Sequence, residues 1–257
     1  MKILILGAGK MGSFFTDLLS FEHEIAVLES NPQRMRFIYN AIRLQQPAEI
    51  ADFMPDLVIN CVTLNYTIEA FKVVIPYLPP KCIISDIASV KTNLQEFYNT
   101  CGFPFASTHP MFGPTFANLG NLERENTILI SESDHLGKIF FKDLYTKLKL
   151  NIFEYTFEEH DKVVAYSLGI PFASTLVFAA TMKHQDAPGT TFKRHLKTAR
   201  GLLSEDDYLL TEILFNPRTP NQIKNIQEEL SKLQKIIEKR DSVAMKDYLS
   251  GIRNNLE

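Results

Sequence analysis

The 257-residue sequence has few cysteines and little net charge. Its three cysteines, Cys61, Cys82 and Cys101, are odd in number and lack the spacing of a metal site. We therefore expect reduced thiols, no bound metal ion and a cytoplasmic protein. Lys and Arg total 27 against 30 for Asp and Glu, which gives a net charge of −3. A chain so balanced has no overall field that would attract nucleic acid or an anionic membrane, although a local basic pocket stays open.

The sequence also contains no internal repeats or low-complexity segments, and we expect no signal peptide. The apolar run Met1–Gly7 is too short for a signal peptide. Hydrophobic residues make up 45% and charged residues 22%, which is typical of globular proteins and excludes a disordered or fibrous chain. The length suffices for one large domain or two modest ones.

One uncharged run, Val163–Met182, is long enough to span a membrane. Small and polar residues dilute its hydrophobicity, and it is the single such run in the sequence. A helix that is apolar on all sides can equally be buried between subunits. We favour that interpretation and predict a homodimer that buries this run, with no membrane and no nucleic acid as partner.

The first half of the sequence alternates short apolar runs with helical stretches. Continuous apolar runs such as Ile3–Leu6 are typical of strands that are covered by helices on both faces. The predicted strands are Lys2–Leu6, Glu24–Glu29, Leu57–Val62, Cys82–Asp86, Phe103–Thr108, Thr127–Ser131 and Asn151–Tyr155. The predicted helices between them are Met11–Leu19, Asn31–Ile42, Tyr66–Ile75 and Val90–Thr100. This alternation predicts an α/β fold with a Rossmann-type, doubly wound parallel sheet.

The second half has a helical pattern throughout. The predicted helices are Phe157–Met182, Phe192–Leu203, Asp206–Leu214, an amphipathic helix with its apolar stripe from Ile223 to Ile237, and Val243–Ile252. We expect a dinucleotide-binding domain at residues 1–156 and an all-helical substrate and dimerisation domain at residues 157–257.

A glycine pattern at the N-terminus predicts a nucleotide cofactor. Gly7, Gly9 and Gly12, with Lys10 and Met11 between them, follow the first strand and open a helix. The first glycine allows a tight turn, the second lets the backbone approach a pyrophosphate, and the third lets the helix pack closely.

The second predicted strand ends at Glu29, where an acid accepts hydrogen bonds from the adenosine ribose and repels a 2′-phosphate. This favours NAD as the cofactor. Arg34 and Arg36 follow shortly afterwards and could accommodate that phosphate, so NADP stays open.

Two polar clusters stand at the ends of later predicted strands, where α/β sheets bind ligands. One contains Ser85, Ser89 and Lys91, and the other is His109 between Thr108 and Pro110. Histidine titrates near neutrality, so His109 can accept a proton while a neighbouring carbon loses hydride. A serine such as Ser89 could orient the imidazole or bind a substrate hydroxyl.

The block His-Pro-Met-Phe-Gly-Pro from His109, together with Ser-Asp-Ile-Ala-Ser-Val-Lys from Ser85 and the glycine loop, resembles the prephenate/arogenate dehydrogenases of tyrosine biosynthesis. The resemblance covers most of the chain. It implies NAD(P)-dependent oxidative decarboxylation of prephenate or arogenate, with His109 as the catalytic histidine and Ser89 as the hydroxyl-binding serine. The family's His-Asp pair at the start of the helical domain falls on His160-Asp161.

The sequence departs from the family at the substrate pocket. The family's Ser-His-Leu-Pro-His stretch corresponds to Leu168–Phe172, which keeps the proline and has neither histidine. The acidic gate residue after the His-Pro block is absent, since Pro114-Thr115 stands there. The arginine that grips the ring carboxylate has three candidates in one predicted helix: Arg194, Lys197 and Arg200.

Two other functions remain open from the residues. A β-hydroxy-acid-type dehydrogenase would use a lysine on the helical domain, and Lys162 and Lys183 are available. A non-catalytic NAD-binding regulator would keep the glycine loop and lose the chemistry. Both fit Ser89 and His109 less well than the first interpretation does.

Overall fold

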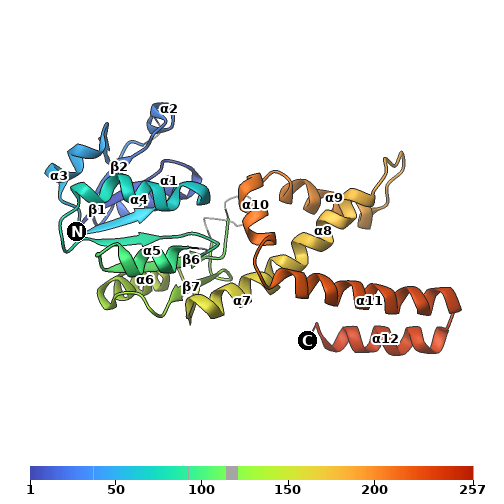
Figure 1. Ribbon diagram of the computed structural model, residues 1–257. Coiled ribbons are helices and arrows are strands. Elements are labelled where there is room, and N and C mark those ends of the chain that lie inside the picture. The colour runs from blue at the N-terminus through green and yellow to red at the C-terminus, as the bar shows by residue number, and fades with distance from the viewer. Residues whose placement is uncertain (37, 92, 114–120, 257) are drawn as a thin grey trace. The chain divides into compact units, whose positions relative to one another are not determined.

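The computed structural model describes residues 1–36, 38–91, 93–113 and 121–256, which form two compact units (Figure 1). The first contains Met1–Val164 and Leu203–Glu212, and the second contains Ala165–Leu202 and Ile213–Glu257. The units divide within helix α7 (Phe157–Ser167), whose first residue follows the boundary expected at residue 156.

The first unit is built on an eight-stranded sheet with the order β3-β2-β1-β4-β5-β6-β7-β8. Neighbouring strands are parallel except β6 and β7. The predicted Rossmann-type sheet is therefore confirmed, with an edge strand added. The strands are β1 (Lys2–Leu6), β2 (Glu24–Leu28), β3 (Ile42–Leu44), β4 (Leu57–Asn60), β5 (Ile83–Asp86), β6 (Phe105–Pro110), β7 (Asn126–Ile130) and β8 (Asn151–Tyr155).

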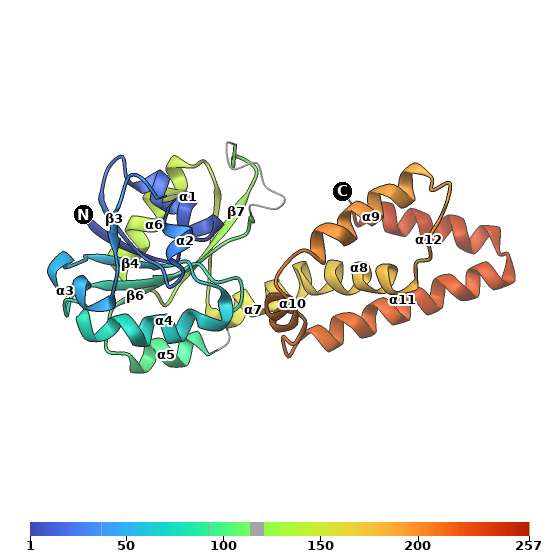
Figure 2. The same cartoon turned by 90° about the horizontal axis from the view of Figure 1, so that it is seen from above.

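Helices cover both faces of this sheet, which is why its central strands are apolar on both sides. One face packs against α1 (Lys10–Leu19) and α6 (His135–Lys147), and the other against α3 (Ile50–Phe53), α4 (Thr67–Val74), α5 (Leu94–Thr100) and the start of α7. Figure 2 shows α4 and α5 along one side and α1 and α6 along the other. Short 3₁₀ turns occupy Pro47–Glu49, Leu64–Tyr66 and Ile75–Tyr77.

The predicted helix Asn31–Ile42 is wrong over most of its length. Helix α2 (Pro32–Met35) is a single turn, capped where the Asn31 side chain accepts from the backbone N–H of Gln33. The chain then turns, and β-branched Ile42 begins edge strand β3 opposite Ala26. Pairing with the sheet edge outweighs local helix propensity here.

Helix α6 was not predicted, although its start carries a recognisable signal. The Asp134 carboxylate accepts hydrogen bonds from the backbone N–H groups of Leu136 and Gly137, which is the N-cap pattern. The helix then buries Phe141, Leu144 and Tyr145 at helical spacing.

The second unit is helical in its described residues. Helix α8 (Gly169–Thr181) contacts α9 (Thr190–Leu202) and α11 (Thr219–Lys239), and α12 (Ser242–Asn254) packs against α11. The short helix α10 (Asp207–Leu214) crosses the division between the units. The predicted single helix Phe157–Met182 is interrupted at Leu168, between α7 and α8.

The stretch Phe157–Thr181 is long and apolar enough to cross a membrane by length and composition. Its most apolar window has a mean hydropathy of 1.8, and 17% of that window is buried within the chain. The second unit therefore leaves an apolar helix largely uncovered by its own chain.

Candidate active site

The predicted site residues of the first unit gather at one edge of the sheet. The glycine loop follows β1, Glu29 follows β2, Ser89 lies in the loop after β5, and His109 lies one residue before the end of β6. These strands are parallel, so their carboxyl ends meet at the same edge. Ligands bind at this edge in open α/β sheets.

The glycine loop has the geometry that the sequence predicts. Gly7 has a φ of +91°, which disfavours any other residue. A Cβ on Gly12 would lie 1.9 Å from the Gly7 carbonyl oxygen, so only glycine allows α1 to start this close to the turn. A Cβ on Gly9 would meet nothing within 4 Å. The space beside Gly9 leaves the backbone open to a ligand, which fits a dinucleotide pyrophosphate.

The Glu29 carboxylate stands beside this loop. It accepts hydrogen bonds from the backbone N–H of Ala8 at 2.7 Å and of Asn31 at 2.8 Å, and Arg34 lies 3.9 Å away. Burial alone would raise the pKa of Glu29, but these donors outweigh it and lower the pKa. Glu29 is therefore ionised, and it ties the glycine loop to the end of β2.

His109 is buried against a second histidine. Alternation along β6 sends Thr108 to one face, where its hydroxyl bonds the Tyr145 hydroxyl at 2.7 Å, and His109 to the other, toward α7. Nδ1 of His109 lies 2.9 Å from Nε2 of His160, and Nδ1 of His160 lies 3.2 Å from the Asp161 carboxylate. The ring of His160 is fully buried.

A buried ion pair lies in the same region. The Lys91 ammonium bonds the Asp86 carboxylate and the Thr108 carbonyl oxygen, and the Tyr98 hydroxyl donates to the other Asp86 oxygen at 2.7 Å. Both charged side chains are completely buried. A buried charge is tolerated only with partners of this kind.

This environment keeps His109 neutral. Desolvation, the neighbouring His160 and the Lys91 charge together hold the pKa of His109 well below its ordinary value of 6.5. Desolvation likewise lowers the pKa of His160, although the Asp161 carboxylate opposes it. A neutral imidazole has a lone pair available, so His109 is chemically a base.

The remaining predicted residues are less closely connected. Ser89 lies half-buried in the loop after β5, and no hydrogen bond among the described residues joins it to His109. Arg194, Lys197 and Arg200 are exposed on α9, in the second unit. Pro114-Thr115 lies outside the described residues.

Sequence reasoning gave no role to Lys91, to Asp86 or to the contact between His109 and His160. The signal for the first two was present, because an Asp and a Lys five residues apart flank Ser89 at a strand end. The contact between the two histidines joins residues 51 positions apart. The sequence patterns predict a strand and a helix there, but they do not predict which residues of the two elements meet.

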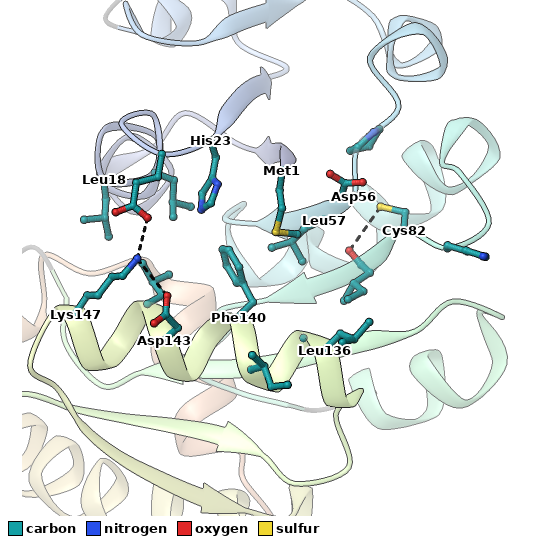
Figure 3. Close-up of a pocket in the computed structure, with 18 of the residues that line it drawn as sticks. Met1, Leu18, His23, Asp56, Leu57, Cys82, Leu136, Phe140, Asp143 and Lys147 are labelled. Carbon is teal, nitrogen blue, oxygen red and sulfur yellow. Dashed lines mark hydrogen bonds and ion pairs between the residues drawn. The ribbon is translucent and has the colours of Figure 1, made fainter.

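A cavity of about 1020 Å³ opens at the other edge of the sheet, where the strands begin (Figure 3). Met1, Asp56, Leu57 and Cys82 line it, and Lys147 at its rim pairs with Glu22 and Asp143. None of the predicted site residues lines it. Within the described part of the chain, no three His, Cys, Asp or Glu side chains form a group that could hold a metal ion.

Comparison with known proteins shows which family the chain resembles. Residues 32–145 match the family described as prephenate dehydrogenase, nucleotide-binding domain. A probable arogenate/prephenate dehydrogenase of Methanocaldococcus jannaschii is 24% identical over 201 residues, which is 72% of this chain. The matched region spans 44% of that longer relative.

Two solved structures show the same fold over the whole chain. Prephenate dehydrogenase from Aquifex aeolicus, in complex with hydroxyphenyl propionate and NAD⁺, has a TM-score of 0.83 at 21% identity, covering 99% of this chain and 96% of that one. Arogenate dehydrogenase from Synechocystis has a TM-score of 0.76 at 19% identity, covering 100% of both. The matched segment contains the His-Pro block, and the sequence match, the relative and the shared fold all make this chain similar to the prephenate/arogenate dehydrogenases.

Proposed function

We propose that this chain is an NAD-dependent dehydrogenase that oxidatively decarboxylates prephenate or arogenate. The observation that carries the proposal is His109, a buried imidazole held neutral at the same sheet edge as the glycine loop. The three cysteines are free thiols, which supports a cytoplasmic enzyme.

The residues at the glycine loop fit NAD. Gly9 leaves the backbone open to the pyrophosphate, and the N-terminus of α1, flanked by Lys10 and Met11, favours negative charge. Glu29 is ionised at the end of β2, so it can accept from ribose hydroxyls and would repel a 2′-phosphate. When bound, NAD supplies the hydride acceptor.

The chain's own residues supply the remaining chemistry. His109 accepts the proton of the ring hydroxyl as hydride leaves the same carbon, which yields a carbonyl conjugated with the ring. The bond from the ring to its carboxylate then breaks, carbon dioxide leaves, and the bonding electrons pass through the ring to the carbonyl oxygen, which takes back a proton to give the phenol. Ser89 would hydrogen-bond the reacting hydroxyl, and a cation on α9 would hold a carboxylate.

A direct assay tests the proposal. The protein is mixed with NAD and prephenate, and NADH absorbance is followed. In parallel assays, arogenate replaces prephenate, or NADP replaces NAD. We expect NADH with at least one of the two ring substrates. If neither yields NADH while a β-hydroxy acid does, or if the protein binds NAD and oxidises none of them, the proposal is wrong.

Cofactor choice should depend on Glu29. We expect Glu29→Ser to weaken NAD and to improve NADP relative to NAD, because the change removes a ribose acceptor and a charge that repels phosphate. Glu29→Gln keeps the size of the side chain and removes its charge, so it measures the effect of the charge alone. Glu24→Ala, at the exposed start of the same strand, is the control.

The measurement is KM for each cofactor, with a melting curve for each variant because Glu29 also holds Ala8. A wild-type protein that already prefers NADP would mean that Arg34 or Arg36 governs this site and that the role given to Glu29 is wrong.

Substrate affinity should depend on α9. This helix carries Arg194, Lys197 and Arg200 and no acidic residue, so it presents uncompensated positive charge to a dianionic substrate. We expect separate alanine substitutions to reveal one large rise in substrate KM, preferably at an arginine, whose fork binds a carboxylate through two hydrogen bonds. Lys224→Ala on α11 is the matched control. Three near-neutral results would exclude this helix as the source of the clamp.

We also propose a homodimer that covers α8. Val177 is 60% exposed within the chain, and most of the apolar window around it is uncovered. A second copy with two-fold symmetry is the commonest way to bury such a surface in a soluble protein.

Introducing charge into that surface should therefore disrupt assembly. We expect Val177→Asp to lower dimer content, stability and activity together, whereas Ser231→Asp on exposed α11 should change none of them. Light scattering of the wild-type protein at low micromolar concentration provides the test. A well-folded, active monomer of 29.3 kDa would refute the dimer.

A further inference from the structure

The Asp161 carboxylate, His160 and His109 form a hydrogen-bonded row within the first unit. Nδ1 of His160 faces a carboxylate oxygen at 3.2 Å, and Nε2 of the same ring faces Nδ1 of His109 at 2.9 Å. His160 and Asp161 are adjacent at the middle of α7, whereas His109 belongs to β6. The row thus fixes the catalytic strand against a helix.

The hydrogen positions in this row follow from the chemistry of its ends. A carboxylate can only accept, so Nδ1 of His160 must carry the hydrogen. Burial lowers the pKa of His160, and the nearby Lys91 charge acts in the same direction, so the ring is neutral and holds one hydrogen. Its Nε2 is then an acceptor.

Only one arrangement of His109 satisfies that acceptor. Nδ1 of His109 must donate to Nε2 of His160, because two bare nitrogens at 2.9 Å would repel each other. His109 is also neutral, so its single hydrogen is on Nδ1 and its Nε2 keeps the lone pair. The opposite tautomer would leave a lone pair facing His160 and a hydrogen on the nitrogen that must act as the base.

We propose that His160 is a positioning residue: oriented by Asp161, it holds His109 in the tautomer whose Nε2 is free to accept the substrate proton. The inference rests on the proposed function for the role of Nε2, but the tautomer itself is a property of the protein without substrate. The role of His160 is then similar to that of the Asp that orients the histidine of a Ser-His-Asp triad.

The tautomer can be observed directly by ¹⁵N NMR of imidazole nitrogens at neutral pH in the substrate-free protein. The signals of His109 are identified by their loss in His109→Asn. We expect a protonated Nδ1 and a bare Nε2 in wild-type protein. In His160→Leu the acceptor is gone, and His109 should show a substantial population of the Nε2–H form.

Kinetics provide the second readout. His160→Leu should lower kcat by about tenfold to a thousandfold with little change in substrate KM, because His160 acts through His109. His160→Gln can offer its amide oxygen at the place of Nε2, so it should restore the Nδ1–H form and most of the lost turnover. A purely structural role would give no such rescue of the tautomer.

Phe157→Leu is the matched control for packing. Phe157 is buried one turn earlier on α7 and contacts Phe105 on β6, away from the imidazoles. It should lower the melting temperature and leave both the tautomer and kcat per folded molecule unchanged.

A wild-type His109 with hydrogen on Nε2, or a His160→Leu protein with an unchanged His109 tautomer, would overturn the inference. If the tautomer behaves as expected but no substrate is oxidised, the proposed function fails and the positioning role of His160 in the fold remains.

Discussion

Replacing His109 by Asn is expected to lower turnover by about a hundredfold to ten-thousandfold, which is the usual contribution of a positioned acid-base group. Asn cannot accept a proton at neutral pH, so the ring hydroxyl loses its base. NAD affinity should be unchanged, because the glycine loop and Glu29 lie on other strands of the sheet. Some stability should be lost, since His109 is 5% exposed and bonded to His160.

The control for this loss of packing is Tyr145→Phe. It removes the hydrogen bond to Thr108, the neighbour of His109 on the opposite face of β6, and should cost stability without lowering kcat. The pH profile adds a second readout. Because the pKa of His109 in the substrate-free protein lies well below 6.5, wild-type kcat/KM should stay level as the pH falls through 6.5 and decline only at lower pH. Near-native turnover in His109→Asn would refute the catalytic assignment.

The second large effect is expected at two glycines of one loop that differ in what surrounds them. Gly12→Ala puts a Cβ 1.9 Å from the Gly7 carbonyl oxygen, so α1 must shift away from the turn. We expect a loss of about 3 kcal/mol in the free energy of unfolding and no measurable NAD binding. Gly9→Ala meets nothing within 4 Å, so it should fold like the wild type and still bind NAD at least about tenfold more weakly.

Denaturant unfolding and NAD titration of both variants separate the two roles. Gly102→Ala, at a positive φ of +77° remote from the loop in sequence, reports the cost of backbone strain alone. Wild-type NAD affinity in Gly9→Ala would mean that the pyrophosphate does not approach this part of the backbone.

Most of the sheet could be predicted from the sequence because each central strand is a continuous apolar run. Ile3–Leu6 is buried on both faces, and its apolar run predicts a strand whether or not the adjacent elements are predicted correctly. Edge strand β3 has two exposed residues of three, so it has no such pattern, and only its first residue, Ile42, falls within the predicted helix Asn31–Ile42. The break in the helix at Leu168 could not be predicted either. Gly169 stands among apolar residues in the sequence, and it packs against Thr219, 50 positions later.

The site was predictable where a local motif carries the chemistry. The glycine loop, Glu29 and His109 each stand at the end of a strand, and their residue types indicate their roles. The neutrality of His109 could not be predicted, because it depends first on burial and then on His160 and Lys91, which only the fold brings close to β6. Local spacing identifies a base, whereas tertiary contacts set its pKa.

We propose that His109, as the base for hydride transfer, makes decarboxylation of the ring substrate possible. The most direct test measures NADH and labelled carbon dioxide together, from prephenate labelled at its ring carboxylate, with wild-type protein and with His109→Asn. We expect one carbon dioxide per NADH in the wild type and a parallel loss of both in the variant. NADH without carbon dioxide, or equal rates in the two proteins, would contradict it.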